Sequence, residues 1–317
     1  MTVIGIDIGG TSIKGALVDA ASRKILSQTA QPTCADEGLD RVVGQINKVV
    51  AALLALPGGA ESRGIGIGVP GSVDVARGLV LHPPNLRGWE EVPLGALIAD
   101  AWTLPVSLDN DANCAALGEA TFGAGNGIRD FIALTLGTGV GSGLILDGRI
   151  HHGARGYGGE FGHMTIDFNG PLCGCGNYGC VEAYVGNSYI VARARAEIAA
   201  HPESALYAVA MQHPEDVTPK LIAEAAQSGD SCALRVLYDT GDKLGVAIAS
   251  AANLLDVTTF IIGGGVSAAG APLFDGIVSG ARTRVLRVHR DSLRILPAAL
   301  GNDAGVLGAA SLVLAAE

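Results

Sequence analysis

Three cysteines and a histidine stand close together in the middle of the chain. Cys173, Cys175 and Cys180 lie in the run CGCGNYGC, and His163 precedes the first of them by ten residues. Three thiolates and one imidazole are a common ligand set for structural zinc, which prefers a tetrahedron of soft or borderline donors. The intervening glycines allow the backbone to turn sharply enough for the sulfurs to converge. The spacing therefore predicts a structural Zn²⁺ site formed by these four residues.

Buried free thiols and disulfides are the alternatives for this cluster. Three of the six cysteines fall within eight residues, which scattered core cysteines would not do. The N-terminal run MTVIGIDIGG is typical of a strand rather than of a signal peptide, so we expect a cytoplasmic protein whose thiols stay reduced. Zinc is therefore favoured, whereas the isolated Cys34, Cys114 and Cys232 are interpreted as small apolar residues.

Two glutamates flank the cysteine cluster. Glu160 lies just before the histidine in GEFGH, and Glu182 lies just after the last cysteine in GCVEAY. A metal ion that orders this loop would also hold both carboxylates in fixed positions.

A glycine turn follows the first β-branched run of the chain. The motif DIGGT contains Asp7, Gly9, Gly10 and Thr11, and Lys14 follows it. Glycines let backbone N–H groups approach phosphate oxygens, while the threonine hydroxyl and the lysine can add a donor and a charge. Asp7 could orient the water shell of Mg²⁺, which favours carboxylates, waters and phosphates. An ordinary hairpin turn is the alternative, since the spacing fits neither the dinucleotide fingerprint nor a Walker A loop.

Two further glycine turns come after predicted strands. Gly137, Thr138 and Gly139 form the first, and Gly264 and Gly265 belong to the second, which precedes a predicted helix. Three such turns at strand ends favour a nucleotide bound in a cleft between two domains.

A carboxylate motif lies where a strand is expected to pass into a helix. The run LDNDAN contains Asp109, Asn110 and Asp111. One interpretation is a catalytic carboxylate at the start of the helix, and the other is helix capping, for which Asn and Asp are good residues. Both can hold for adjacent residues, and Asp109 is the weaker catalytic candidate.

The hydrophobic pattern predicts alternating strands and helices. We expect strands at 3–8, 12–19, 64–69, 106–108, 131–136, 143–146 and 258–262, and helices at 39–56, 93–102, 111–122, 181–200, from 219, 230–255 and 303–316. Such alternation predicts α/β layers. The strand, glycine turn and return strand occur twice, which favours two related domains.

The charge balance excludes several classes of function. The net charge is −10 with a pI of about 5.1, and no basic stripe is visible, so nucleic acid is not an expected partner. No apolar run approaches the roughly 18 residues of a membrane helix, so we expect no membrane association. An acidic chain that handles phosphate must hold it with backbone N–H groups, a few cations and a metal ion.

Taken together, these motifs resemble the ROK family of repressors, open reading frames and kinases. The matching stretches are DIGGTSIKGALVD, GVPGSVD, PNLRGW, LDNDANCAALGEA, LTLGTGVGSGLIL, GEFGHMTID, CGCGNYGCVEAY, FIIGGGVS and NDAGVLGAA. The resemblance implies the two-domain α/β fold shared by actin, hexokinase and Hsp70-type ATPases. Its N-terminal domain would span residues 1–115, completed by a C-terminal helix at about 302–317. The C-terminal domain would span 116–301 and carry the zinc loop.

The resemblance also implies a reaction and assigns roles to residues. It implies ATP-dependent phosphorylation of the 6-hydroxyl of a hexose, with Asp111 as general base. The sugar would be bound by Gly71, Asn85, Asn110, Asp111, Glu160, His163 and Glu182. The first phosphate loop would be Gly9, Gly10, Thr11 and Lys14, with Asp7 beside it. The second would be Gly137, Thr138 and Gly139, and Gly264 and Gly265 would lie on the adenosine side.

The motifs indicate the sugar substrate less clearly than they indicate the reaction. PNLRGW and ALGEATFGAG most resemble bacterial members that phosphorylate glucose, whereas GEFGHM also resembles N-acetylglucosamine kinases. N-acetylmannosamine and fructose stay open as substrates, as does polyphosphate as donor. A sugar-responsive repressor or a catalytically inactive sensor is the alternative from another class. The resemblance implies a homodimer, with a tetramer as the alternative.

Overall fold

The computed structural model describes residues 1–314, and the chain divides into two compact units. Unit 1 consists of Met1–Arg129, Gly143–Gly159 and the chain from Ala299 onward, and unit 2 consists of Asp130–Ser142 and Glu160–Ala298. The sequence-based boundary after residue 115 differs, because it falls inside a helix that belongs entirely to unit 1.

Unit 1 is built on a five-stranded sheet of order β3-β2-β1-β4-β8. Its strands are β1 (Thr2–Ile8), β2 (Ser12–Asp19), β3 (Lys24–Pro32), β4 (Ser62–Val69) and β8 (Val106–Asn110). β2 is antiparallel to both β1 and β3, whereas β1, β4 and β8 run parallel to one another. The carboxyl ends of these three parallel strands therefore lie at one edge of the sheet. A small second sheet contains β5 (Ser72–Asp74), β6 (Leu79–Leu81) and β7 (Glu91–Val92).

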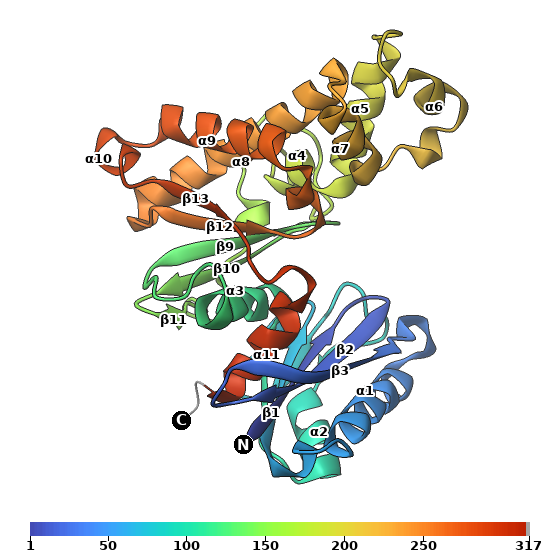
Figure 1. The fold of residues 1–317 in the computed structure, drawn as a ribbon, viewed down its shortest axis with the longest axis vertical. Helices are drawn as coiled ribbons and strands as arrows, with labels where there is room; N and C mark the ends of the chain where they lie inside the picture. Colours follow the sequence, from blue (N-terminus) through green and yellow to red (C-terminus); the bar gives the residue numbers. More distant parts are fainter. Residues whose placement is uncertain (315–317) are drawn as a thin grey trace. The chain divides into compact units, whose positions relative to one another are not determined.

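Helices cover both faces of the unit 1 sheet because β1 is apolar on both sides (Figure 1). Ile4, Ile6 and Ile8 pack with α1 (Leu39–Leu54) and α2 (Leu94–Trp102) in one buried cluster. On the other face, Val3 packs with Val306, Leu307 and Ala310 of α11 (Ala304–Leu314). Neighbouring residues of one strand thus support two layers of helices.

Helix α3 (Asp111–Phe122) is held in unit 1 by close packing and by a buried carboxylate. It packs closely on α11. Glu119 is 2% exposed, and its carboxylate accepts N–H groups of Ala124, Ala299 and Leu300 at 2.7–3.1 Å. The returning C-terminal segment is therefore tied to the helix that begins at Asp111.

Unit 2 contains most of the other five-stranded sheet, which has the order β11-β10-β9-β12-β13. Its strands are β9 (Phe131–Leu136), β10 (Val140–Leu146), β11 (Arg149–Ile150), β12 (Thr259–Gly263) and β13 (Arg294–Pro297), and the unit boundary passes through β10 after Ser142. β12 runs parallel to both β9 and β13. The helices of unit 2 are α4 (Glu182–Val185), α5 (Asn187–Ala199), α6 (Tyr207–Gln212), α7 (Pro219–Gln227), α8 (Ser231–Leu255), α9 (Ala271–Arg284) and α10 (Arg287–Arg290).

Most elements expected from the sequence are confirmed, with one clear error. The expected strands and helices are present within a few residues of their predicted bounds, and the side chains of Thr218 and Asp230 cap α7 and α8. The single helix predicted at 181–200 is wrong, because Gly186 adopts an extended conformation that separates α4 from α5. The last two residues of the helix predicted at 303–316 lie outside the described residues. Within residues 1–314, no helix is both long enough and apolar enough to cross a membrane.

Candidate active site

The predicted site residues of unit 1 gather at the carboxyl ends of β1, β4 and β8. Asp7 near the end of β1 pairs in register with Lys14 of β2. A Cβ atom placed on Gly10 would lie 3.7 Å from the Cβ of Asn85. Gly71 has φ +89°, which suits glycine, and its carbonyl accepts the side-chain amide of Asn110 at 3.0 Å. The structure thus brings these residues, together with Gly9, Thr11 and Asp111, to one edge of the sheet.

The first glycine turn is a structured hairpin as well as a candidate phosphate loop. The N–H of Gly9 donates to the carbonyl of Ser12 at 2.9 Å. The hydroxyl of Thr33 donates to the carbonyl of Gly9 at 2.7 Å, and the N–H of Thr33 donates to the carbonyl of Thr11 at 3.0 Å. The hairpin interpretation of the motif is therefore confirmed, and the phosphate-loop interpretation stays a prediction. Because the Gly9 amide is used within the turn, Gly10 and Thr11 are the stronger candidates for phosphate contacts.

Asn110 takes the capping role at this junction, which leaves Asp111 as the catalytic candidate. Asn110 is the N-cap of α3, and its side-chain oxygen accepts N–H groups of Ala112 and Asn113 at 2.8 and 3.3 Å. Asp111 is the first residue of the helix and needs no capping role. Its carboxylate accepts the adjacent N–H of Ala112 at 2.9 Å.

Two buried carboxyl groups influence each other at this edge. Burial raises the pKa of Asp7, and the charge of Lys14 offsets part of that effect. Burial, with a smaller contribution from the negative charge of Asp7, raises the pKa of Asp111 to about 6. A carboxylate with a pKa near that value is a better proton acceptor than an exposed one, which suits a general base at neutral pH.

His152 is a residue of this edge that the sequence did not reveal. Its Nε2 atom lies 2.7 Å from Oδ2 of Asp109, next to Asn110 and Asp111. The pair His151-His152 after a short strand carries no distinguishing pattern, and 43 residues separate His152 from its partner. The weaker catalytic candidate of the sequence, Asp109, is therefore engaged in a buried contact.

In unit 2, the second glycine turn and Glu182 are in direct contact. Gly137, Thr138 and Gly139 connect β9 to β10, and Oε2 of Glu182 accepts the N–H of Val140 at 3.0 Å. A Cβ atom at Gly139 would overlap the Glu182 carboxylate, which would then have to move. The carboxylate predicted to bind ligand is thus fixed against the second candidate phosphate loop.

The four predicted metal ligands converge within unit 2. One ligand atom from each of His163, Cys173, Cys175 and Cys180 lies within 4.8 Å of every other. The sulfurs of Cys175 and Cys180 are 3.7 Å apart, and the Cys173 sulfur is 3.8 Å from Nδ1 of His163. Three thiols and an imidazole at such distances fit a tetrahedral zinc ion, so the donor set passes this test of its chemistry.

His163 lies between Cys173, another candidate metal ligand, and the carboxylate of Glu160. Nδ1 of His163 faces Cys173, whereas Nε2 faces the carboxylate of Glu160 at 3.9 Å. Glu182 lies on another side of the cluster, with Oε1 3.7 Å from the Cys173 sulfur. Glu160, His163 and Glu182 are therefore all positioned by the same loop.

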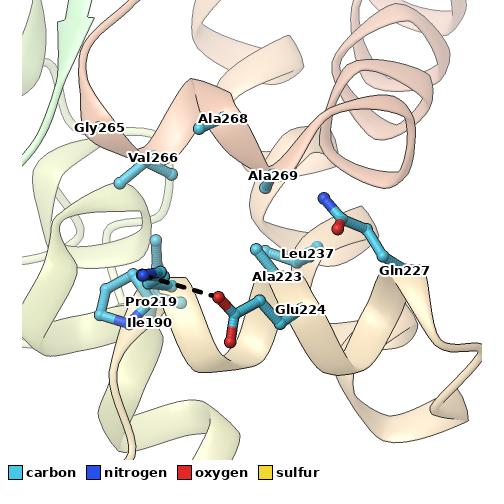
Figure 2. Close-up of a pocket in the computed structure, with 11 residues that line it drawn as sticks. Ile190, Pro219, Ala223, Glu224, Gln227, Leu237, Gly265, Val266, Ala268 and Ala269 are labelled. Atoms are coloured by element: carbon cyan, nitrogen blue, oxygen red, sulfur yellow. Dashed lines mark ion pairs between the residues drawn. The ribbon is translucent and has the colours of Figure 1, made fainter.

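A pocket of about 410 Å³ opens beside the third glycine turn (Figure 2). Figure 2 shows Gly265 and Val266 on one side and Ala223 of α7 on the other. Lys220 and Glu224 form an exposed ion pair of 3.7 Å beside it. Gly264 directly precedes this wall, and the lining side chains are mostly apolar. The pocket suits a largely apolar ligand with a few polar groups.

The site residues fall into two sets according to the units. Unit 1 carries Asp7, Gly9, Gly10, Thr11, Lys14, Gly71, Asn85, Asn110 and Asp111, and unit 2 carries Gly137, Thr138, Gly139, Glu160, His163, Glu182, Gly264, Gly265 and the three cysteines. Each set is assembled within its own unit.

Comparisons with known proteins agree with the motifs. The chain matches the ROK family over residues 3–316. A glucokinase of Thermotoga maritima is 36% identical over 313 residues, which cover 99% of this chain and 97% of that protein. A ROK family glucokinase from Streptomyces griseus, solved in complex with glucose and AMPPNP, has a TM-score of 0.82 and 37% identity, covering 98% of this chain and 99% of that one. A xylose repressor of Caldicellulosiruptor bescii is 31% identical, covering 99% of this chain and 78% of the repressor.

These similarities extend over nearly the whole chain and over both units. The likeness to solved ROK sugar kinases confirms the two-domain α/β fold of the actin-like ATPases that the sequence predicted. The family match covers the glycine turns, the carboxylate junction and the cysteine cluster alike. The chain therefore belongs to the ROK family.

Proposed function

We propose that this protein is an ATP-dependent glucokinase that phosphorylates the 6-hydroxyl of D-glucose. The observation that carries the proposal is Asp111, a buried carboxylate at the start of α3 with a raised pKa, next to an asparagine that caps the helix. The similarity to glucokinases over the whole chain supports the same reaction. N-acetylglucosamine, N-acetylmannosamine and fructose are the competing sugars.

The reaction requires a proton acceptor and a fixed sugar. The Asp111 carboxylate takes the proton of the primary hydroxyl while that oxygen forms its bond to the γ-phosphorus. The bond from the γ-phosphorus to the bridging oxygen breaks at the same time, and ADP leaves. Asn110 binds sugar hydroxyls beside Asp111, with Asn85 and Gly71 nearby. Glu160, His163 and Glu182 bind hydroxyls at the anomeric end of the sugar, where the loop of unit 2 fixes them.

The nucleotide contacts follow from the three glycine turns. The adenine occupies the pocket beside Gly265, whose apolar walls match its faces. Backbone N–H groups of Gly10, Thr11 and the turn Gly137–Gly139 bind the phosphates, and Lys14 adds a positive charge. Mg²⁺ bound to ATP would neutralise phosphate charge, and Asp7 is the carboxylate placed to hold its water shell.

Zinc has a structural role in this proposal. All four ligand positions are filled by His163, Cys173, Cys175 and Cys180, so no open coordination position remains for catalysis. The ion would hold the loop that carries Glu160 and Glu182. The expected homodimer stays a prediction, which light scattering of the purified protein checks.

The proposal is tested by the release of ADP from Mg-ATP with a panel of sugars. We expect kcat/KM to be highest for glucose among glucose, mannose, fructose, N-acetylglucosamine and N-acetylmannosamine. A higher value for another sugar would correct the substrate and keep the reaction. If no sugar supports ADP release, and polyphosphate does not replace ATP, the kinase assignment is wrong.

The assignment of the adenine pocket predicts a selective effect on ATP. Replacing Ala268, which lines the pocket, with Trp should fill the space and raise the KM for ATP by about tenfold or more, because the base loses its apolar walls. The KM for glucose should change little. Ala271→Trp is the matched control, since Ala271 is exposed and does not line the pocket. Equal effects of both variants on ATP would show that adenine binds elsewhere.

The raised pKa of Asp111 predicts an acid limb in the pH profile. A general base must be ionised, so kcat/KM for glucose should fall as the pH decreases through about 6 and should level off above it. Removing the charge of Asp7 with Asp7→Asn should move this limb to lower pH, because that charge contributes to the raised pKa. A wild-type profile that stays flat well below pH 6 would contradict the assignment.

A further inference from the structure

Asp109 is a buried carboxylate to which the proposed reaction gives no role. Its side chain is 3% exposed and lies near the end of β8. Oδ1 accepts the N–H of Asn110 at 2.7 Å and the side-chain amide of Asn113 at 2.8 Å. One oxygen thus holds the last residue of the strand and the first turn of α3, on either side of Asp111. The position of Asp111 therefore depends on the orientation of the Asp109 carboxylate.

His152 contacts the second oxygen of that carboxylate. Its Nε2 atom lies 2.7 Å from Oδ2, and its side chain is 31% exposed. The hydrogen bond to Asp109 raises the pKa of His152, which favours the protonated ring opposite the carboxylate. The backbone carbonyl of His152 accepts the N–H of Gly158 at 2.8 Å, and this bond closes the loop between the two residues. The loop therefore fixes the backbone of His152, while its side chain faces Asp109.

We propose that His152 is a positioning residue of the kinase, which fixes Asn110 and Asp111 through the carboxylate of Asp109. The inference rests on the proposed function, because it assigns the two positioned residues to sugar binding and proton transfer. His152 itself lies outside hydrogen-bonding contact with either of them among the described interactions.

The physical reason lies in the cost of leaving a buried carboxylate oxygen without a partner. Without His152, Oδ2 would keep its desolvation penalty and lose its compensating hydrogen bond. The carboxylate would then rotate toward water or take up a proton, and either change would disturb the two contacts of Oδ1. Those contacts set the junction between β8 and α3. A displacement of Asp111 by a fraction of an ångström is enough to slow proton transfer.

The test compares His152→Leu with His152→Gln in the full-length enzyme. We expect His152→Leu to lower kcat by about tenfold and to raise the KM and the calorimetric dissociation constant for glucose. The KM for ATP should stay within about twofold of the wild-type value, since the pocket assigned to adenine lies in unit 2. His152→Gln retains an N–H donor and should restore most of the loss. His151→Ala is the control, because this neighbouring histidine is exposed.

Asp109→Asn supplies the second arm, since two residues that act as one unit have non-additive effects. The double variant His152→Leu/Asp109→Asn should be no slower than the slower single variant. Multiplied effects would overturn the proposal, as would a His152→Leu enzyme with wild-type kcat and KM for glucose. The proposal would also be overturned if the loss of activity were explained by a lower melting temperature alone, with the KM values for glucose and ATP unchanged. If the wild-type enzyme binds glucose without phosphorylating it, the proposed function fails, while the dissociation constants still test His152.

Discussion

Asp111→Asn should lower kcat for glucose phosphorylation by about a thousandfold, because the amide cannot accept the proton of the 6-hydroxyl. The dissociation constant for glucose should change little, since Asn has nearly the same shape and Asn110 still caps α3. Steady-state kinetics and calorimetry measure the two quantities separately. Asp100→Asn, at an exposed carboxylate of α2, is the matched control and should leave kcat unchanged. Near-normal turnover of Asp111→Asn would remove Asp111 as the general base.

The same substitution should stabilise the fold at neutral pH. The pKa of Asp111 rises from 3.8 to about 6 on folding, so the folded state favours the protonated acid. Its contribution to stability is fully present below the unfolded pKa and is lost as the pH rises through about 6. Removing the ionised carboxylate should therefore increase the free energy of unfolding near pH 7, by at most about 3 kcal/mol. The difference between wild type and variant should disappear below about pH 4, where both side chains are neutral.

These two expectations together describe a residue whose charge costs stability and provides catalysis. Burial and the nearby charge of Asp7 raise the free energy of the ionised form, and the reaction uses that form as a base. If Asp111→Asn lost activity without gaining stability, the carboxylate would be better solvated than its burial indicates.

The parts of the site that the sequence predicted are local in the chain. The ligands His163, Cys173, Cys175 and Cys180 occupy one loop, so their spacing alone restricts how they can meet. Asn110 and Asp111 mark a strand-to-helix junction by residue type, and each glycine turn follows a β-branched run. Such residues can be recognised in a sequence because the side-chain types and the backbone conformation are encoded within a few residues of each other.

The parts that the sequence did not predict depend on contacts between distant segments. His152 meets Asp109 across 43 residues, from the loop that follows β11. The pocket beside Gly265 takes its walls from α5, α7 and α8 as well as from the turn. The use of the Gly9 amide inside its own hairpin also required the structure, because the motif alone does not show which N–H groups remain for phosphate.

Local pattern also failed where one residue had two possible conformations. The apolar spacing at 181–200 favours one helix, yet Gly186 is extended and ends α4 after Val185. The break places Glu182 in a short helix of its own, beside Val140 of the second glycine turn. A continuous helix would have made this residue part of a longer element, so the error concerned a position that matters for the site.

Removing zinc should impair sugar binding more than nucleotide binding. Cys175→Ala deletes one of four ligands, so the purified variant should lose the one zinc ion per chain that we expect in the wild type. Glu160, His163 and Glu182 are held by this loop, and the KM for glucose should therefore rise by about tenfold or more. The KM for ATP should change less, because the pocket beside Gly265 is built from other elements. Metal analysis and steady-state kinetics measure the two effects.

The control for this prediction is the other cysteine that lies near possible metal ligands. Cys232 forms a cluster with Glu197 and His201, but Arg235 already contacts both Glu197 and Cys232, at 2.8 and 3.3 Å. A guanidinium in that place opposes the binding of a metal cation, so Cys232→Ala should keep its zinc and its KM for glucose. If Cys232→Ala lost its zinc and Cys175→Ala kept it, the ion would belong to the Cys232 cluster and the present assignment would be wrong. A wild-type protein without zinc, but with normal glucose phosphorylation, would mean that hydrogen bonds among the thiols and His163 are sufficient to order the loop.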